Sequence, residues 1–281
     1  MQKELIITAD GSHSIKYSSD FSLRENSERT MKPDFSLLED ELPEIDFDNP
    51  QTFPQVPENE ENRFVMYHSK HGALQESVHV FIKAGLHELL PLQQPLTVFE
   101  MGFGTGLNAL LTALEADRSK VQVSYNAVEA FPLEEEFWKQ LNFCEVISEN
   151  AGYKNLLAAE NNLNCKNILT TLHSSRWNDT VQVTPYFDLI KFHSTIQDIT
   201  LPEAINLVYF DAFAPDAQPE LWTTEIFTRI AKAMAPDGIL VTYCSKGYVR
   251  RNLQAAGLEV EKIPGPRGKR EMLRARKPVR S

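Results

Sequence analysis

The residues best suited to chemistry are three glycines at alternate positions, which follow an apolar strand that ends in a carboxylate. They lie in the stretch Val98-Phe99-Glu100-Met101-Gly102-Phe103-Gly104-Thr105-Gly106. Glycine permits a tight turn from strand to helix and lets the backbone approach a ligand closely. The N–H groups that begin the next helix, expected from Leu107 with Asn108 near its start, would add polar contacts. The spacing predicts a loop that binds a nucleotide-type cofactor.

The spacing of the glycines also distinguishes between cofactors. The dinucleotide fingerprint fits only when it is shifted to Gly104, Gly106 and Ala109, which leaves Glu100 and Gly102 without a role. Read in place, E-x-G-x-G-x-G resembles the first motif of class I methyltransferases, whose loop wraps the amino-acid end of S-adenosylmethionine. In that resemblance the strand-tip carboxylate faces the ammonium of the cofactor. It implies a set of cofactor-binding residues: Glu100, Gly102, Phe103, Gly104, Gly106 and Asn108.

A second carboxylate is expected at the tip of the next strand, where acidic residues bind ribose hydroxyls in other nucleotide folds. The segment Val121 to Glu129 supplies it, about one strand-helix-strand unit after Glu100. Glu129 is therefore predicted to bind the cofactor as well. An ordinary glycine turn is the alternative interpretation of the loop, and it leaves Glu129 unexplained.

A further candidate for chemistry is Asp211, which ends the apolar run Asn206 to Phe210. Open α/β sheets bind ligands at the carboxyl ends of their strands. An aromatic and proline-rich loop follows at once, with Phe213 and Pro215. Similar loops in amino-methylating enzymes hold an amine by hydrogen bonding while the aromatic ring stacks on a base. Asp211 is the predicted catalytic residue and Phe213 and Pro215 the substrate pocket, with helix capping by Asp211 as the alternative.

Charge is distributed unevenly along this chain of net charge -11. Residues 34–61 hold ten carboxylates, four prolines and no Lys or Arg, which predicts an extended acidic insertion at about 22–62. Residues 246–281 hold eleven basic and three acidic residues. Such a basic end indicates a polyanionic partner, with a merely solvated tail as the alternative.

Several protein classes are not indicated. No apolar run approaches the roughly 20 residues of a membrane span, and the N-terminus lacks a signal-peptide pattern, so a cytoplasmic protein is expected. Cys144, Cys165 and Cys244 are odd in number and far apart, which indicates neither a disulfide framework nor a zinc site. The histidines between residues 68 and 87 are interpreted as loop or surface residues. We therefore expect no metal.

The elements that must position these residues alternate from Leu96 onward, which predicts an α/β fold with a mostly parallel sheet and helices on both faces. The expected strands are 96–100, 121–128, 187–192, 206–210 and 238–244, and the expected helices are 106–116, 132–142, 149–163, 219–234 and 247–256. Segments 258–263 and 269–275 predict a C-terminal antiparallel hairpin around Pro264-Gly265-Pro266.

The first 95 residues are expected to pack on this methyltransferase domain of residues 96–281. They begin with a β-hairpin around Asp10-Gly11, continue through the acidic insertion and end in a helix with Ser77 as its N-cap.

The whole pattern resembles the methyltransferase domain of the MnmC family, the tRNA 5-methylaminomethyl-2-thiouridine biosynthesis enzymes. The matching motifs are Glu100-Met101-Gly102-Phe103-Gly104-Thr105-Gly106-Leu107-Asn108, Glu129-Ala130-Phe131-Pro132, Phe210-Asp211-Ala212-Phe213-Ala214-Pro215, Ser245 to Leu253 and Gly268-Lys269-Arg270-Glu271-Met272-Leu273. One departure is His193-Ser194, which stands where family members tend to carry a Gly-Asp pair near the adenine.

The resemblance implies a class I, Rossmann-like fold and an enzyme that uses S-adenosylmethionine to methylate 5-aminomethyl-(2-thio)uridine at the tRNA wobble position. We expect a monomer. The resemblance also implies contacts to the anticodon stem-loop by Lys246, Arg250, Arg251, Lys269 and Arg270. Family members often carry a fused flavin-dependent oxidase, and because the chain stops shortly after Leu273, we expect no flavin. The alternatives are a methyltransferase of small amines, a non-catalytic RNA-binding module and, least supported by the glycine spacing, a nicotinamide oxidoreductase.

Overall fold

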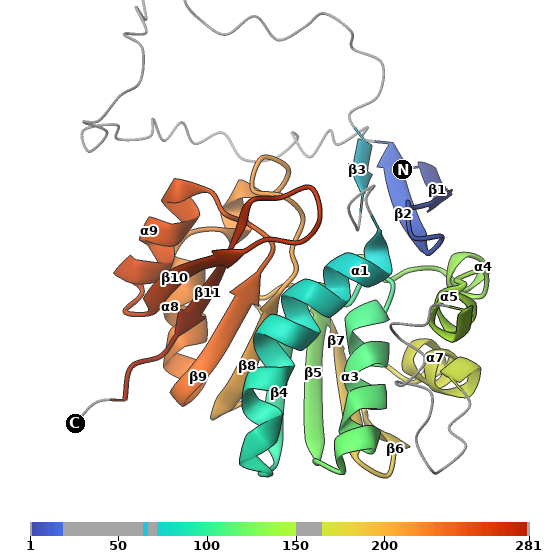
Figure 1. The fold of residues 1–281 in the computed structure, drawn as a ribbon, viewed down its shortest axis with the longest axis horizontal. Coiled ribbons are helices and arrows are strands. Elements are labelled where there is room, and N and C mark those ends of the chain that lie inside the picture. The colour runs from blue at the N-terminus through green and yellow to red at the C-terminus, as the bar shows by residue number, and fades with distance from the viewer. Residues whose placement is uncertain (1, 19–63, 67–71, 150–164, 280–281) are drawn as a thin grey trace, which may run out of the picture.

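The main feature of the fold is an eight-stranded sheet with strand order β10-β11-β9-β8-β4-β5-β7-β6 (Figure 1). The computed structural model describes residues 2–18, 64–66, 72–149 and 165–279. The strands are β4 (Leu96–Met101), β5 (Val123–Glu129), β6 (Thr180–Thr184), β7 (Phe187–His193), β8 (Ile205–Phe210), β9 (Met234–Thr242), β10 (Glu259–Pro264) and β11 (Glu271–Arg276). The strands from β9 to β7 pair in parallel, and both edges of the sheet are antiparallel. The predicted α/β fold and C-terminal hairpin are therefore confirmed.

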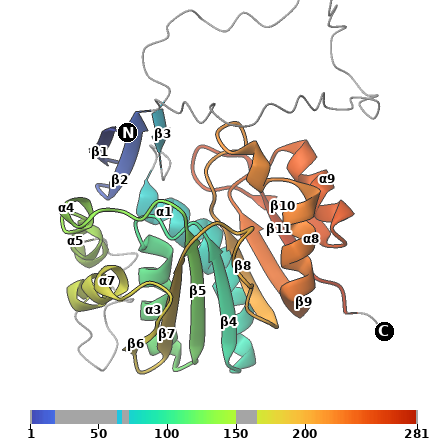
Figure 2. The same cartoon turned by 180° about the vertical axis from the view of Figure 1, so that it is seen from behind.

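Helices cover both faces of this sheet. One face packs against the continuous helical segment α1 (Ala73–Ser77), η1 (Val78–Leu86) and α2 (His87–Leu89), and against α3 (Leu107–Ser119) (Figure 1). The view from behind shows β4, β5 and β8 in front of these helices (Figure 2). The other face packs against α8 (Thr224–Ala233) and α9 (Gly247–Ala255). The remaining described helices are η2 (Leu90–Leu92), α4 (Glu135–Trp138), α5 (Phe143–Glu149), α7 (Cys165–Ser174) and η3 (Pro219–Leu221).

The alternation of side chains along the central strands explains this two-sided burial. On β8, Leu207 and Tyr209 enter one buried cluster, and Val208 and Phe210 enter the other. Successive side chains of a strand point to opposite faces, so an apolar run without polar interruption is buried on both sides. Because β4 pairs in parallel with both β5 and β8, the carboxyl ends of these strands, and with them Glu100, Glu129 and Asp211, lie at one end of the sheet.

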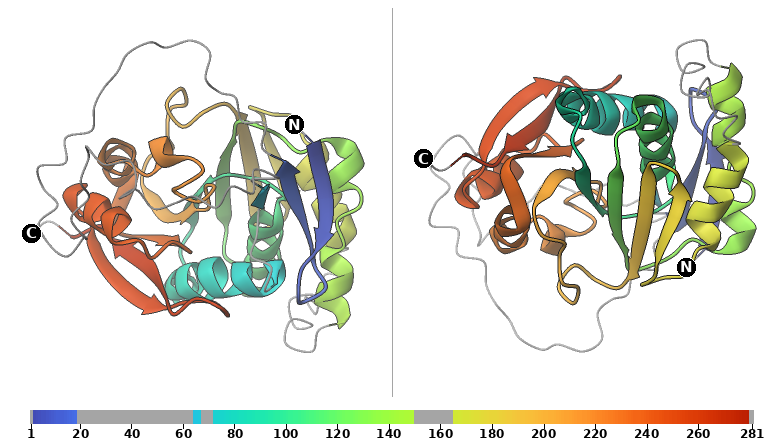
Figure 3. Two further views of the ribbon diagram at one scale, coloured as in Figure 1. Left: turned by 90° about the horizontal axis from the view of Figure 1, so that it is seen from above. Right: turned by 90° about the horizontal axis from the view of Figure 1, so that it is seen from below.

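The N-terminal hairpin is confirmed as β1 (Gln2–Ile7) and β2 (His13–Ser18), with β3 (Phe64–Met66) as an unpredicted third strand. It lies beside α4 and α5 (Figure 3). Asn142 fixes it there, because its side chain accepts from the His13 N–H at 2.8 Å and donates to the Gly11 carbonyl at 2.8 Å.

The prediction of Ser77 as a helix N-cap is wrong. The helix begins at Ala73, with Gly72 as its N-cap residue, and Ser77 is buried inside it. The turn of the N-terminal hairpin supplies the capping groups instead: Asp10 accepts from the Gln75 N–H at 2.9 Å and Thr8 accepts from the Ala73 N–H at 3.1 Å. Side-chain oxygens satisfy the free N–H groups of a helix start whether they are near or distant in sequence.

We expect Asp10→Ala to lower the free energy of unfolding by about 1 kcal/mol, the usual cost of losing an N-cap. A urea titration followed by circular dichroism measures this. Asp179→Ala, at an exposed loop position, is the matched control and should leave stability unchanged. An Asp10 variant as stable as the control would show that the hairpin does not cap this helix.

The expectation that the cysteines form no disulfide is also wrong for one pair. Cys144 of α5 and Cys165 of α7 are bonded, whereas Cys244 is a buried free thiol. The expected helix 132–142 is shorter, since only Glu135–Trp138 is helical before α5 begins. The acidic insertion, His68, His71 and nearly all of the expected helix 149–163 lie outside the described residues. Within the described ranges, no helix is long and apolar enough to cross a membrane.

Candidate active site

The glycine loop leaves β4 in a conformation that favours glycine at all three positions. Gly102, Gly104 and Gly106 have φ values of 92°, 51° and 70°. A Cβ atom on Gly102 would lie 2.9 Å from the Asp211 carbonyl oxygen, so the loops after β4 and β8 are in contact. Glycine is needed here both for its backbone angles and for this close approach.

Glu129 is directly connected to the glycine loop. One oxygen of its carboxylate accepts from the Gly104 N–H at 3.0 Å, and the other accepts from the Phe131 N–H at 2.8 Å. The residue is 8% exposed. The predicted ribose-binding carboxylate therefore lies against the predicted cofactor loop, in a position that two backbone N–H groups fix.

Asn108 joins the two predicted functional regions. Its Nδ2 donates to Glu100 Oε1 at 3.0 Å and to Asp211 Oδ2 at 2.8 Å. Glu100 Oε2 and Asn108 Oδ1 are buried without a hydrogen-bond partner among the described residues. Leaving such groups unpaired is costly, and a ligand that donates hydrogen bonds would remove the cost. The ammonium of S-adenosylmethionine has this chemistry, so these residues fit the cofactor.

The electrostatics of Glu100 agree with a cation-binding role. Burial raises the pKa of this carboxyl well above its ordinary value, and the charge of Asp211 raises it further, while the Asn108 hydrogen bond opposes the shift. A cation bound beside Glu100 would favour the ionised form. Cofactor binding should therefore be linked to proton release from this residue.

Asp211 follows β8, where its backbone N–H donates to the Met101 carbonyl at 3.1 Å. Burial raises the pKa of its carboxyl to about 7, with a further increase from Glu76 and a decrease from Asn108 and Lys269. The alternative role as a helix cap has no support, because Thr223 caps α8 by accepting from the Ile226 N–H. A carboxyl with this pKa can gain or lose a proton near neutral pH.

The loop after Asp211 is held from two sides. Trp222 donates its indole N–H to the Phe213 carbonyl at 2.9 Å, and Tyr243 donates its hydroxyl to the Ala212 carbonyl at 2.8 Å. Pro215 is buried and Phe213 is half-buried. The backbone of the predicted substrate loop is thereby fixed next to Asp211.

The five residues predicted to bind tRNA have different surroundings. Arg250, Arg251 and Arg270 are exposed, and Lys246 forms an exposed ion pair with Asp216 at 2.5 Å. Lys269 instead forms an ion pair with the buried Glu76 at 2.8 Å. The structure therefore places Lys269 with the active-site loops and the three arginines on the surface.

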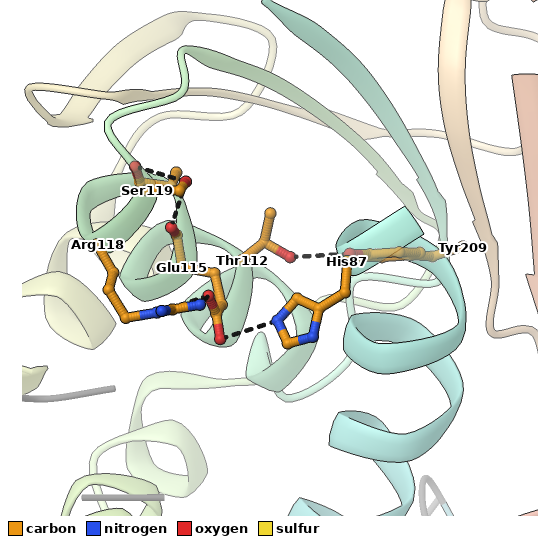
Figure 4. A network of polar contacts seen from close by, with 7 residues as sticks. His87, Thr112, Glu115, Arg118, Ser119 and Tyr209 are labelled. Atoms are coloured by element: carbon orange, nitrogen blue, oxygen red, sulfur yellow. Dashed lines mark hydrogen bonds and ion pairs between the residues drawn. The ribbon is translucent and has the colours of Figure 1, made fainter. Parts of the chain in front are cut away.

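A polar network below the site fixes the helix that carries Asn108 (Figure 4). Thr112 donates its hydroxyl to the Asn108 carbonyl at 2.7 Å and lies 3.2 Å from the Tyr209 hydroxyl. One turn further along, Glu115 contacts His87 at 3.1 Å and accepts from Arg118 at 2.9 Å. These contacts join α3 to the segment α1 to α2 and to β8, so Asn108 keeps its position relative to Asp211.

Two charged residues at this end of the sheet, Glu76 and Lys191, are not identified by the sequence analysis. Glu76 was missed because only the fold brings α1 to Asp211. Lys191 was missed because a lysine in a strand is usually exposed, whereas this one is 1% exposed. Its ammonium donates to the His173 carbonyl at 2.9 Å and lies 4.6 Å from the centre of the Trp177 ring, and burial lowers its pKa to about 8. The alternation Phe187, Leu189, Lys191 on one strand face is the signal that could have revealed it.

No group of three or more acidic, histidine or cysteine side chains that could hold a metal ion occurs in the part of the chain that the structure describes.

Comparisons with known proteins agree with this geometry. A family model described as S-adenosyl-L-methionine-dependent methyltransferase matches residues 167–278. The chain is 31% identical over 217 residues to the tRNA 5-methylaminomethyl-2-thiouridine biosynthesis bifunctional protein MnmC of Cupriavidus metallidurans, with 75% of this chain and 31% of that protein covered. The corresponding protein of Nitrosospira multiformis is 32% identical over 224 residues, with 74% and 33% covered.

A solved structure supports the fold. The crystal structure of MNMC2 from Aquifex aeolicus matches with a TM-score of 0.64 and 18% identity, and the match covers 100% of this chain and 73% of that one. The chain spans about a third of the length of the curated relatives it matches. The motifs, the sheet topology and these similarities together show that the chain is MnmC-like and has a class I methyltransferase fold.

Proposed function

We propose that this chain transfers a methyl group from S-adenosylmethionine to the amine of 5-aminomethyl-(2-thio)uridine at the wobble position of tRNA. One observation carries the proposal. A single side-chain amide, Asn108 Nδ2, hydrogen-bonds both Glu100 at the cofactor loop and Asp211 at the substrate loop. The names of the relatives supply the substrate, because the MnmC proteins are named for 5-methylaminomethyl-2-thiouridine biosynthesis in tRNA.

The residues have separate roles in this proposal. S-adenosylmethionine supplies an electrophilic methyl group when it is bound. Glu100 and the glycine loop hold its amino-acid end, and Glu129 holds its ribose. Asp211 accepts a hydrogen bond from the substrate amine and, as the base of the reaction, takes a proton from its ammonium form. Most of the catalysis comes from holding the amine nitrogen in line with the methyl group and the sulfur. The fixed loop with Phe213 and Pro215 shapes the space for the uracil ring.

The reaction changes no oxidation state, so it needs no flavin. The methyl group is already activated by the positive charge on the sulfonium sulfur, so the transfer needs no metal as a Lewis acid. Isothermal titration calorimetry and a transfer assay test the proposal together. S-adenosylmethionine should bind at one site per chain, NADH should not bind, and labelled methyl should pass to tRNA rather than to a polyamine. Binding of NADH alone would support an oxidoreductase, and labelling of the polyamine alone would support a small-amine methyltransferase.

The surface arginines should contribute a sequence-independent attraction to tRNA phosphates. We expect Arg250→Ala, Arg251→Ala and Arg270→Ala to raise the Kd for tRNA and to reduce the log–log salt slope by about 0.7 to 0.9 for each phosphate contact that is lost. Fluorescence anisotropy at several salt concentrations measures both. Lys83→Ala, an exposed position on η1, is the control for a general charge effect. Equal salt slopes in all four variants would mean that tRNA binds another face.

A further inference from the structure

Two oppositely charged side chains beside Asp211 have no role in the proposed function so far. Glu76 lies on α1 and is 8% exposed, and Lys269 lies in the turn between β10 and β11. Although 193 positions separate them, Lys269 Nζ donates to Glu76 Oε1 at 2.8 Å. The fold therefore brings a buried carboxylate and a lysine together from elements that are far apart in the sequence.

Tyr243 connects the pair to the loop that begins with Asp211. Lys269 Nζ lies 4.2 Å from the centre of the Tyr243 ring. The hydroxyl of the same tyrosine donates to the carbonyl of Ala212, the residue after Asp211. Asp211 is held from α3 by Asn108, whose amide also contacts Glu100. The amine site is thus flanked by the Glu76–Lys269 pair and by Asn108 with Glu100.

We propose that Glu76 and Lys269 are positioning residues of the amine site, which together hold Asp211 in the charge state that methyl transfer needs. This inference rests on the proposed function. It assigns Lys269 to the chemistry of the amine and not to the binding of tRNA phosphates.

The chemistry explains why the charge state matters. A primary amine near neutral pH is largely an ammonium ion, which has no lone pair for attack. The Asp211 carboxylate removes one proton from the ammonium, and the freed lone pair forms the new C–N bond while the C–S bond of the sulfonium breaks. The products are a secondary ammonium, S-adenosylhomocysteine and a protonated Asp211, which returns its proton to solvent. Asp211 must therefore be ionised at the start of each cycle.

The charged and titratable groups that act on Asp211 come from several elements. Glu76 on α1 raises the pKa of Asp211, whereas Lys269 in the β10–β11 turn and the Asn108 amide on α3 lower it. Glu100 on β4, Tyr125 on β5 and Tyr243, directly after β9, also interact electrostatically with Asp211. Glu76 and Lys269 are the two members of this set that carry opposite charges and contact each other.

The test compares pH profiles of kcat/KM for Glu76→Gln and Lys269→Met on tRNA that contains 5-aminomethyl-2-thiouridine. The acidic limb is the part of the profile in which activity rises with pH as Asp211 ionises. Glu76→Gln removes a negative charge and should move this limb to lower pH. Lys269→Met removes a positive charge and should move it to higher pH. Activity on that limb should change about tenfold for each pH unit of displacement. Kd values for S-adenosylmethionine and tRNA should stay close to those of the wild type. A purely structural role would not displace the limb in opposite directions.

The chain offers a matched control on the same hairpin. Lys262 and Glu271 form an ion pair of the same length, 2.8 Å, at more exposed positions. Lys262→Met and Glu271→Gln should leave the acidic limb in place. Lys269→Arg keeps the charge and should also keep the limb, which provides a second readout if Lys269→Met does not fold.

Two results would overturn the inference. An unchanged limb in both variants, or a displacement in the same direction, would show that the pair does not act on Asp211. A Lys269→Met variant with a higher Kd for tRNA, a flatter salt dependence and an unchanged limb would show that Lys269 binds phosphate. In either case the active wild-type protein would still support the proposed function. A wild-type protein that binds S-adenosylmethionine but leaves this tRNA unmethylated would overturn both.

Discussion

Replacing Asp211 with alanine is expected to lower kcat by about two to four orders of magnitude, the usual contribution of a positioned acid or base. The carboxylate accepts the hydrogen bonds and the proton of the reacting amine, and the alanine side chain does neither. The Kd for S-adenosylmethionine should change little, because Glu129 keeps its bond to the cofactor loop and Glu100 keeps its bond to Asn108. Single-turnover transfer of labelled methyl measures the first quantity and calorimetry the second.

A conservative substitution separates chemistry from structure at this position. Asp211→Asn can still bond with Asn108 but cannot take a proton, so its kcat should be as low as that of the alanine variant. Asp198→Ala, at an exposed position, is the control and should keep full activity. If Asp211→Ala instead lost cofactor binding in proportion to its activity, Asp211 would be a cofactor-holding residue.

The second large effect is expected at Glu129. Glu129→Ala should weaken S-adenosylmethionine binding by roughly 1 to 3 kcal/mol, the cost of losing hydrogen bonds to a charged group. Two contributions add here. The ribose loses its carboxylate, and the Gly104 and Phe131 N–H groups lose the acceptor that fixes the loop. Calorimetry at constant pH measures the change in Kd.

Glu129→Gln is the companion variant. Its amide keeps one oxygen, which can accept from only one of the two N–H groups that the Glu129 carboxylate binds. We expect an intermediate affinity. Glu136→Ala, an exposed position on α4, is the matched control. An affinity for S-adenosylmethionine that survives Glu129→Ala unchanged would remove Glu129 from the cofactor site.

The parts of the fold that were predictable from sequence are those with local causes. The glycine spacing after Phe99 requires particular backbone angles at Gly102, Gly104 and Gly106, and these angles occur. The segments that precede Glu100, Glu129 and Asp211 are central strands of a parallel sheet and are buried over most of their length. Parallel strands end at the same edge, so the meeting of these carboxylates follows from their positions alone.

The parts that were not predictable depend on contacts between distant segments. Asp10 and Thr8 cap a helix more than sixty residues away. Nothing in the local sequence shows these partners, so Ser77, a residue of the capping type within the segment, was predicted in their place. The bond between Cys144 and Cys165 requires α5 and α7 to be neighbours, and sequence spacing gives no sign of that. The basic tail predicted a surface role for Lys269, since charge composition does not reveal the buried partner Glu76.

The most direct test of the central claim is nucleoside analysis after the protein is incubated with S-adenosylmethionine and tRNA from cells that lack this methylation. We expect 5-aminomethyl-2-thiouridine to decrease and 5-methylaminomethyl-2-thiouridine to increase by the same amount, and both changes to be absent with Asp211→Ala. The carboxymethylaminomethyl form should stay unchanged. Methylation of another nucleoside, or no methylation of tRNA by a protein that binds S-adenosylmethionine, would contradict the account.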